Sequence, residues 1–281
     1  MGDPRCTIVV ASRDRHAELH ATTARHRALP ERPRVIVVDD ASAHPIDAPR
    51  TDLIRLPASL GGAARTVGAR ATTSPYVAFT DDDAWWEPGA LRRAADLLDA
   101  HPRLAVVQAH VLVGPAEKDD PTCAQMRTSP LKPHHDQPGH PILSFIACAV
   151  VVRQAAFLAC GGFHPSFGTG GEEELLSWDL VAAGWQLSYV PDVIAHHRPP
   201  PAPDGRPARR ATMIRNALWT QWLRRPLPAA ARATAETLRA APRDRTTARA
   251  FASAVAGGRW ILRERRVNPP HVEVMCRRLA R

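Results

Sequence analysis

Short apolar segments rich in β-branched residues alternate with helix-like segments in the first two-thirds of this chain. Residues 7–11 (TIVVA), 35–38 (VIVV) and 76–80 (YVAFT) have the composition of strands that are buried on both faces. Residues 14–29 and 88–100 have the length and composition of helices that follow such strands. Strands alternating with helices predict an α/β domain, with a mainly parallel sheet flanked by helices.

Two further apolar segments are strand-like. We expect a strand at 104–113 and a buried strand at 142–152, and the second is too short to span a bilayer. Residues 1–5 carry charge at once and lack the apolar core of a signal peptide. The five cysteines are widely spaced without a C-x-x-C pair, which argues against a disulfide framework and a zinc knuckle. We therefore expect a cytoplasmic protein without an integral membrane segment.

Charge divides the chain into two unequal parts. The 281 residues have a formal net charge of +9, which would suit an anionic partner. The charge is uneven, however, because residues 1–197 carry a net −5 and residues 198–281 a net +14. A proline-rich stretch, which cannot continue a helix or a central strand, lies at the break. We predict a domain at 1–198, a proline-rich linker at 199–208 and an arginine-rich helical extension at 209–281.

Carboxylates directly follow two of the predicted strands. Asp39 and Asp40 end one strand, and the triplet Asp81-Asp82-Asp83 ends another. Ligands of α/β sheets bind beyond the carboxyl ends of the strands. Side chains at i and i+2 of an extended segment point the same way, so Asp81 and Asp83 can converge on one cation. Oxygen ligands suit Mg²⁺ or Mn²⁺, although a solvated acidic turn explains the triplet equally well.

A third acidic cluster, Glu172-Glu173-Glu174, begins a segment with apolar residues at helical spacing. Gly184 is typical of the residue that follows a helix. The three glutamates therefore occupy a first helical turn, where the helix dipole favours their ionised form. An ionised carboxylate near a substrate hydroxyl can act as a general base. Acidic residues are also favoured at helix starts for structural reasons alone, so the cluster does not by itself identify a base.

The order and combination of these motifs resemble the family 2 glycosyltransferases, which have the GT-A fold. The resemblance covers about residues 5–197. Residues 38–42 (VDDAS) are similar to the family's nucleotide-binding strand end, and residues 59–68 (SLGGAARTVG) resemble its Gly/Arg loop and retain Arg65. The triplet at 81–83 falls where the family has its Asp-x-Asp metal motif.

Two downstream motifs extend the resemblance. The Gly-Glu-Glu at 171–173 is similar to the Gly-Glu-Asp that supplies the catalytic base, which implies Glu173 as the base and Glu172 as the second candidate. A later segment looks like the strand that ends in a histidine near the metal, and His197 fits that spacing better than His196.

The acceptor side of the family pattern is altered in this chain. Leu175 and Asp179 stand where the family often has Asp and Arg. We therefore expect the acceptor contacts to differ from the family's usual ones, while the core chemistry is retained.

The resemblance implies an enzyme of glycan biosynthesis. It implies inverting transfer of a sugar from a nucleotide-diphosphate sugar to a hydroxyl of a glycan, lipid-linked or small-molecule acceptor. The implied cofactor is Mg²⁺ or Mn²⁺, held by Asp81 and Asp83 with His197 or His196. The residues implied in nucleotide-sugar binding are Asp39, Asp40, Arg65, Asp81 and Asp82.

The arginine-rich extension has the pattern of several helices. Residues 207–225 form an amphipathic basic segment with tryptophans, and further helical segments are expected at 228–241, 246–265 and 270–280. Such a helix either docks on the first domain through its apolar stripe or lies on an anionic membrane at its inner face. We favour docking, because an apolar stripe usually belongs to a core.

A non-catalytic function is the alternative to an enzyme. In that case an α/β domain would carry an arginine-rich arm that binds an anionic membrane surface or nucleic acid. Nucleic acid is disfavoured, because the arm has no zinc, homeodomain or RNP-type motif.

Overall fold

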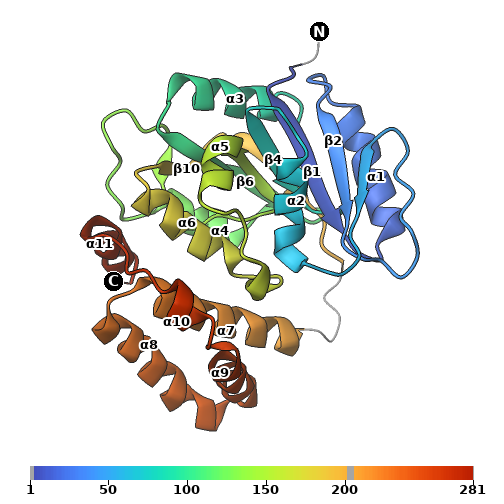
Figure 1. Cartoon of the computed structure of the whole chain (residues 1–281). Coiled ribbons are helices and arrows are strands. Elements are labelled where there is room, and N and C mark those ends of the chain that lie inside the picture. The colour runs from blue at the N-terminus through green and yellow to red at the C-terminus, as the bar shows by residue number, and fades with distance from the viewer. Residues whose placement is uncertain (1–2, 201–205, 281) are drawn as a thin grey trace.

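The computed structural model describes residues 3–200 and 206–280 and contains a central mixed sheet flanked by helices, with further helices at the C-terminus (Figure 1). Within the described residues, ten strands form one sheet whose main path runs β3-β2-β1-β4-β9-β6-β10-β5. The strands are β1 (Cys6–Ser12), β2 (Arg34–Asp39), β3 (Asp52–Arg55), β4 (Tyr76–Thr80), β5 (Ala84–Trp86), β6 (Leu104–Val113), β7 (Lys118–Asp119), β8 (His140–Pro141), β9 (Ala149–Arg153) and β10 (Gln186–His197).

The predicted α/β fold is confirmed, and the sheet has a parallel half and a mixed half. β1 pairs in parallel with β2 and β4, and β2 pairs in parallel with β3. β9 runs antiparallel between β4 and β6, and β6 and β10 are parallel to each other. The parallel half brings the carboxyl ends of β1, β2 and β4 to one edge.

The strand predicted at 142–152 is wrong over its first half. β9 begins only at Ala149, and residues 142–148 form a loop with the backbone N–H of Ile146 donating to the Gln108 side chain. Ile142 and Phe145 are nevertheless buried. The apolar run correctly indicated burial, but burial alone does not require an extended backbone.

The helices predicted at 14–29, at 88–100 and after the glutamate cluster are present, and three shorter helices were not predicted. In the first domain they are α1 (His16–Arg27), α2 (Ala64–Arg70), α3 (Ala90–Ala100), α4 (Pro121–Arg127), α5 (Gln154–Ala159) and α6 (Glu172–Ala182), with short 3₁₀ turns η1 (Gly61–Ala63) and η2 (Pro165–Phe167). After α6, Gly184 has a φ of 90°, in the left-handed region expected of the residue that follows a helix. At its other end, α6 begins at Glu172, so the glutamate cluster occupies the first turn of the helix.

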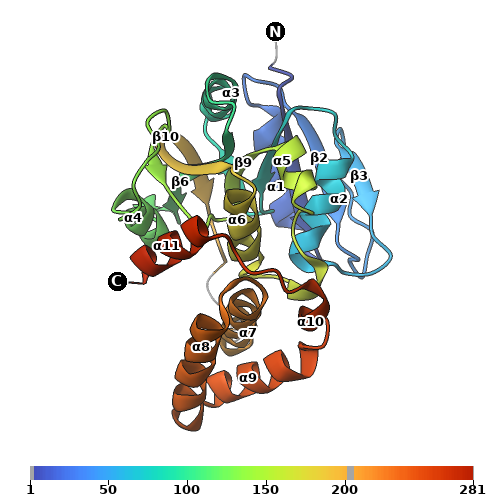
Figure 2. The same ribbon diagram turned by 60° about the vertical axis from the view of Figure 1, so that its left-hand side comes forward.

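The C-terminal helices pack beneath the sheet domain, with α7 and α11 next to α6 (Figures 1 and 2). They are α7 (Arg206–Arg224), α8 (Leu227–Ala240), η3 (Ala241–Arg243), α9 (Arg245–Gly257), α10 (Ile261–Glu264) and α11 (Pro270–Leu279). Leu218, Trp219 and Leu223 of α7 share a buried cluster with Phe167 and Leu175 of the first domain. The apolar stripe of α7 is thus part of a core, as docking requires.

The predicted linker at 199–208 lies partly outside the described residues, which omit 201–205. α7 begins at Arg206, three residues before the predicted start of the extension at 209. The division into domains stays a prediction.

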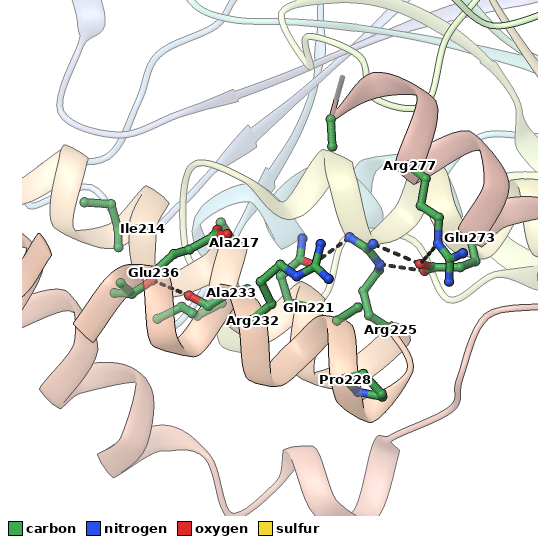
Figure 3. Close-up of a pocket in the computed structure, with 14 residues that line it drawn as sticks. Ile214, Ala217, Gln221, Arg225, Pro228, Arg232, Ala233, Glu236, Glu273 and Arg277 are labelled. Atoms are coloured by element: carbon green, nitrogen blue, oxygen red, sulfur yellow. Dashed lines mark hydrogen bonds and ion pairs between the residues drawn. The ribbon is translucent and has the colours of Figure 1, made fainter. Parts of the chain in front are cut away.

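Ion pairs join the extension to the first domain and to itself. The Arg224 guanidinium binds the Asp179 carboxylate of α6 through two contacts, of 2.5 Å and 2.9 Å. Arg225 binds Glu273 of α11 at 2.6 Å and 3.0 Å, and Arg277 binds the same carboxylate at 2.9 Å (Figure 3). The Arg225–Glu273 and Arg277–Glu273 pairs line a groove of about 850 Å³ between α7, α8 and α11.

Among the helices of the described residues, none combines the length and the apolar character that crossing a bilayer requires.

Replacing Arg224 with Met should lower the free energy of unfolding by about 3 kcal/mol, because it leaves the buried Asp179 carboxylate with only a longer contact to Arg266. Urea unfolding followed by tryptophan fluorescence measures this loss. The double variant Asp179→Leu/Arg224→Met removes the stranded charge and should lose less than the single variant. A larger loss in the double variant would contradict this account of the pair.

Candidate functional site

The ends of β1, β2 and β4 bring two acidic clusters to one edge of the sheet. Ser12 at the end of β1 lies beside Asp39 at the end of β2 in the parallel register. The Ser12 hydroxyl donates to the Asp82 carboxylate at 2.6 Å, which ties the end of β1 to the triplet after β4. The two acidic clusters therefore lie at the same edge of the sheet, beyond the carboxyl ends of its strands.

The two aspartates at the end of β2 have different surroundings. Asp39 is fully buried and accepts the backbone N–H of Ser42 at 2.9 Å. Asp40 accepts the Ser59 hydroxyl at 2.6 Å and the backbone N–H groups of Leu60 and Gly61 at 2.6 Å and 3.0 Å. Asp40 therefore fixes the start of the Gly/Arg loop, in addition to any contact that it makes with a ligand.

A cavity of about 200 Å³ collects most of the residues predicted to bind the donor. Asp40, Arg65, Asp81 and Asp82 line it, whereas Asp39 does not. Arg65 is buried and forms an ion pair with Asp81. The cavity thus presents both signs of charge, and in this structure its Arg65 guanidinium is paired with Asp81.

Arg15 is a site residue that sequence reasoning missed. It lies shortly after β1, and one of its nitrogens is 2.6 Å from the Asp82 carboxylate and 2.9 Å from the Asp83 carboxylate. Burial raises the pKa of Asp82 to about 6. Burial also opposes ionisation of Asp83, but hydrogen bonds from His197 and Arg15 outweigh it and lower the pKa of that carboxyl. The signal was present in the sequence, because the basic residues of Ser12-Arg13-Asp14-Arg15 follow a strand end.

The two candidate metal histidines point to opposite sides of β10, as neighbouring residues of a strand do. His197 Nε2 is 3.3 Å from an Asp83 carboxylate oxygen. His196 instead stacks on Trp85, with ring centroids 5.2 Å apart, and its Nδ1 is 3.3 Å from the Glu117 carboxylate. Only His197 lies at the acidic triplet.

The residues at this edge fit a divalent cation. Ligand atoms of Asp81, His197 and Cys148 lie within 4.8 Å of one another. The buried Asp83 oxygen nearest His197 faces that imidazole at 3.3 Å. Two carboxylates and an imidazole are suitable ligands for Mg²⁺ or Mn²⁺. Cys148 was not expected at the site, and burial raises the pKa of its thiol well above the usual range, so it stays a neutral thiol.

The three glutamates at the start of α6 occupy three different environments. Glu172 is 2% exposed and packs so closely on Gly62 that a Cβ atom there would lie 2.1 Å from its carboxylate. Glu173 is close enough to Arg65 for that charge to favour its ionised form, whereas Glu174 feels the charge of Arg225 in the extension. Of the three, Glu173 and Glu172 both feel the charge of Arg65.

Burial dominates the acidity of all three glutamates. It raises the pKa of Glu172 to about 7, with a further contribution from the neighbouring Glu173. It also raises the pKa of Glu173, and it raises the pKa of Glu174 to about 7. A carboxyl whose pKa lies near neutrality is a better proton acceptor than an ordinary glutamate.

Comparison with known proteins connects this geometry to a family. The model of the family described as Glycosyl transferase family 2 matches residues 7–159. Two curated relatives, the pre-mycofactocin glycosyltransferases of Mycobacterium tuberculosis strains CDC 1551 / Oshkosh and ATCC 25618 / H37Rv, are 29% identical to the chain over 214 residues. That match covers 68% of this chain and 42% of each relative, so the chain spans less than half the length of these relatives.

Solved structures share the fold at low sequence identity. The Pyrobaculum calidifontis mannosyltransferase PcManGT, in complex with GDP-Man and Mn²⁺, has a TM-score of 0.53 at 16% identity, covering 99% of this chain and 86% of its own. S. aureus TarS 1–349 with UDP-GlcNAc has a TM-score of 0.56 at 14% identity, covering 77% and 66%. GalNAc-T7 with UDP, GalNAc and Mn²⁺ has a TM-score of 0.57 at 12% identity, covering 78% and 48%. These likenesses identify the fold as that of GT-A glycosyltransferases.

Replacing Glu174 with Gln should stabilise the protein at alkaline pH. Because burial raises the pKa of Glu174 from its usual 4.5 to about 7, ionising it in the folded state costs stability as the pH rises between these values. We expect the variant to match the wild type near pH 4.5 and to exceed it by about 1 to 3 kcal/mol at pH 8. Urea unfolding at several pH values measures the difference, and an unchanged difference across this range would refute the burial effect.

Proposed function

The chain belongs to glycosyl transferase family 2 and is a glycosyltransferase, and from this premise we propose that it is a metal-dependent, inverting enzyme. It transfers a sugar from a nucleotide-diphosphate sugar to a hydroxyl acceptor. The observation that carries the proposal is the single edge at which Asp40, Arg65 and Asp81 line one cavity and the charge of Arg65 also acts on Glu173. The alternative considered from the sequence, a non-catalytic domain, does not account for the grouping of these charged residues at one cavity.

Donor binding is proposed for the cavity residues and their neighbours. Arg65 and Arg15 supply the positive charge that a diphosphate requires. Asp40, with Asp39 behind it, would contact the nucleotide base from the strand end, and Asp81 and Asp82 would complete the site. Neighbours of the same fold were solved with UDP, UDP-GlcNAc and GDP-Man, which supports a nucleotide-sugar donor.

A divalent cation is proposed at Asp81, Asp83 and His197. When bound, such an ion neutralises the charge that develops on a leaving diphosphate. The buried Asp83 oxygen that faces His197 at 3.3 Å and the short separation of Asp81 from His197 support this assignment. The presence of Mn²⁺ in the structures of PcManGT and GalNAc-T7 supports it further.

Glu173 is proposed as the general base. Its carboxylate would take the proton of the acceptor hydroxyl while that oxygen attacks the anomeric carbon. Attack on the face opposite the leaving diphosphate is a single displacement, and it inverts the anomeric configuration. Glu172 is the second candidate, but its packing against Gly62 leaves it less room to meet an acceptor.

The acceptor is proposed to be a glycan, lipid-linked or small-molecule hydroxyl compound.

Peripheral contact with an anionic membrane is proposed for the arginine-rich extension. It is supported by Leu227 and Leu262, which are 71% and 82% exposed. Vesicle co-sedimentation tests that contact.

The metal-dependent part of nucleotide binding should require Asp83 and His197, but not His196 on the other side of β10. In thermal-shift measurements with UDP, GDP or dTDP, at least one nucleotide should stabilise the wild type more with Mn²⁺ than without it. With Mn²⁺ present, that nucleotide at 100 times its Kd should stabilise the fold by about 2.7 kcal/mol relative to no nucleotide. Asp83→Asn and His197→Gln should lose the metal-dependent part. His196→Gln is the matched control and should keep it, because that ring lies against Trp85. Full metal dependence in Asp83→Asn would sink the metal assignment.

Glu173→Gln should lower kcat by about 10²- to 10⁴-fold and leave donor binding intact, because it removes a proton acceptor without changing the size of the side chain. Glu174→Gln is the control and should keep kcat within about two-fold. In the wild type, kcat should fall as the pH drops through the raised pKa of Glu173, since only the ionised carboxylate accepts a proton. Steady-state rates over pH 5 to 9 check both points, and a larger loss in Glu172→Gln than in Glu173→Gln would move the base to Glu172.

A further inference from the structure

A glycine-rich loop, residues 168–171, leads from η2 into the glutamates of α6. Gly168, Gly170 and Gly171 have φ values of 70°, 101° and 89°, in the region that side chains rarely adopt. Glycines bring no side chains of their own to hold such a loop. Its conformation therefore depends on contacts made by other parts of the chain.

Asn216 of α7 provides contacts of this kind from the C-terminal extension. Its side chain is fully buried, and its amide nitrogen donates to the backbone oxygens of Phe167 at 2.9 Å and Gly170 at 2.6 Å. Its amide oxygen accepts from the Arg215 guanidinium at 2.8 Å and 3.0 Å. The amide is thus bonded on both sides, and Arg215 fixes which end faces the loop.

One peptide unit connects Asn216 to the proposed base. The carbonyl of Gly170 and the N–H of Gly171 belong to the same planar group. Asn216 binds the carbonyl, and the N–H donates to a Glu173 carboxylate oxygen at 3.1 Å. Holding the carbonyl therefore sets the direction of the N–H that holds Glu173, and a hydrogen bond to the carbonyl also strengthens that N–H as a donor.

We propose that Asn216 is a positioning residue, through which the C-terminal extension orients the Glu173 carboxylate by way of the Gly170–Gly171 peptide. The inference rests on the proposed function of Glu173 as the base. It gives the extension a part in catalysis, although Asn216 itself touches no reacting atom.

A second contact holds the loop independently of Asn216. The backbone N–H of Gly62 in η1 donates to the Gly168 oxygen at 2.7 Å. Loss of the Asn216 amide should therefore loosen the end of the loop next to Glu173, while the other end remains attached. The fold should survive, and the effect should appear in the orientation of the base.

The charges near Glu173 make a neutral substitution informative. Arg65 of α2, Asp81 after β4 and the adjacent Glu172 and Glu174 are the titratable or charged groups that act on it. Asn216→Leu is nearly isosteric and changes none of these charges. A change in the pH profile of this variant would thus report the lost orientation of the Gly171 N–H.

The experiment compares Asn216→Leu with Thr220→Val in the full chain. Thr220 is also fully buried and lies one turn further along α7, and among the described residues its hydroxyl bonds only to the α7 backbone. We measure release of UDP from UDP-GlcNAc or GDP from GDP-Man with Mn²⁺, using the donor on which the wild type is most active. Asn216→Leu should lower kcat about 10- to 100-fold, keep the donor KM within about two-fold, and move the acid limb of the pH profile to higher pH. Thr220→Val should change none of these.

Hydrogen exchange of the 167–174 segment tests the positioning role of Asn216 separately from the proposed enzymatic function. Exchange should be faster in Asn216→Leu than in the wild type and in Thr220→Val. Unchanged exchange, or an unchanged kcat and pH profile in an active enzyme, overturns the positioning role of Asn216. A wild type that is inactive with every donor overturns the proposed function instead, and faster exchange in Asn216→Leu would then still support its hold on the loop.

Discussion

The crowding of carboxylates at one edge of the sheet is the constraint on which the rest of the site depends. Three consecutive aspartates follow β4, and Asp39 and Asp40 stand at the end of β2, in partly buried surroundings where like charges repel strongly. Arg15 and Arg65 counter this repulsion by pairing with Asp82, Asp83 and Asp81. The acidic edge is therefore held together by two guanidiniums that enter it from separate segments, one after β1 and the other on α2.

These pairings also bear on how the site can receive a ligand. Arg65 is committed to Asp81 in this structure, and Arg15 to the next two aspartates. A cation at the aspartates would release part of the hold on both guanidiniums, which would then be free to bind an anion. The proposed dependence of nucleotide binding on a cation thus has an electrostatic basis in the pairing of these five side chains.

The sequence was a good guide to where strands end and a poor guide to their direction. The β-branched runs located β1, β2 and β4, and carboxylates after parallel strands had to meet at one edge. Nothing in the composition of β9 distinguishes an antiparallel strand from a parallel one, because both are buried on two faces here. Its first expected residues were misassigned because apolar composition reports burial and not backbone conformation.

In the candidate site, too, some features follow from the local sequence pattern and others depend on the folded chain. Alternation along a strand predicts that His196 and His197 face opposite ways, but which one faces the aspartates depends on the pairing of β10 with its neighbours. Cys148 and Asn216 reach the site from distant parts of the sequence. Their roles depend on contacts formed only in the folded chain, so no local pattern could have identified them.

The arginine-rich extension is more closely tied to the site than its charge suggested. Asp179 stands where the resemblance to family 2 leads one to expect an arginine, and in this chain the guanidinium comes from Arg224 of α7 instead. Because α6 carries a carboxylate at this position instead of a guanidinium, it depends on Arg224 of the extension for its ion-pair partner. Because Asp179 lies on the same helix as Glu173, and Asn216 holds the loop before it, α7 secures the helix of the proposed base at two points. The excess of positive charge in the extension therefore serves, in part, to complete an acidic domain that lacks this arginine of its own.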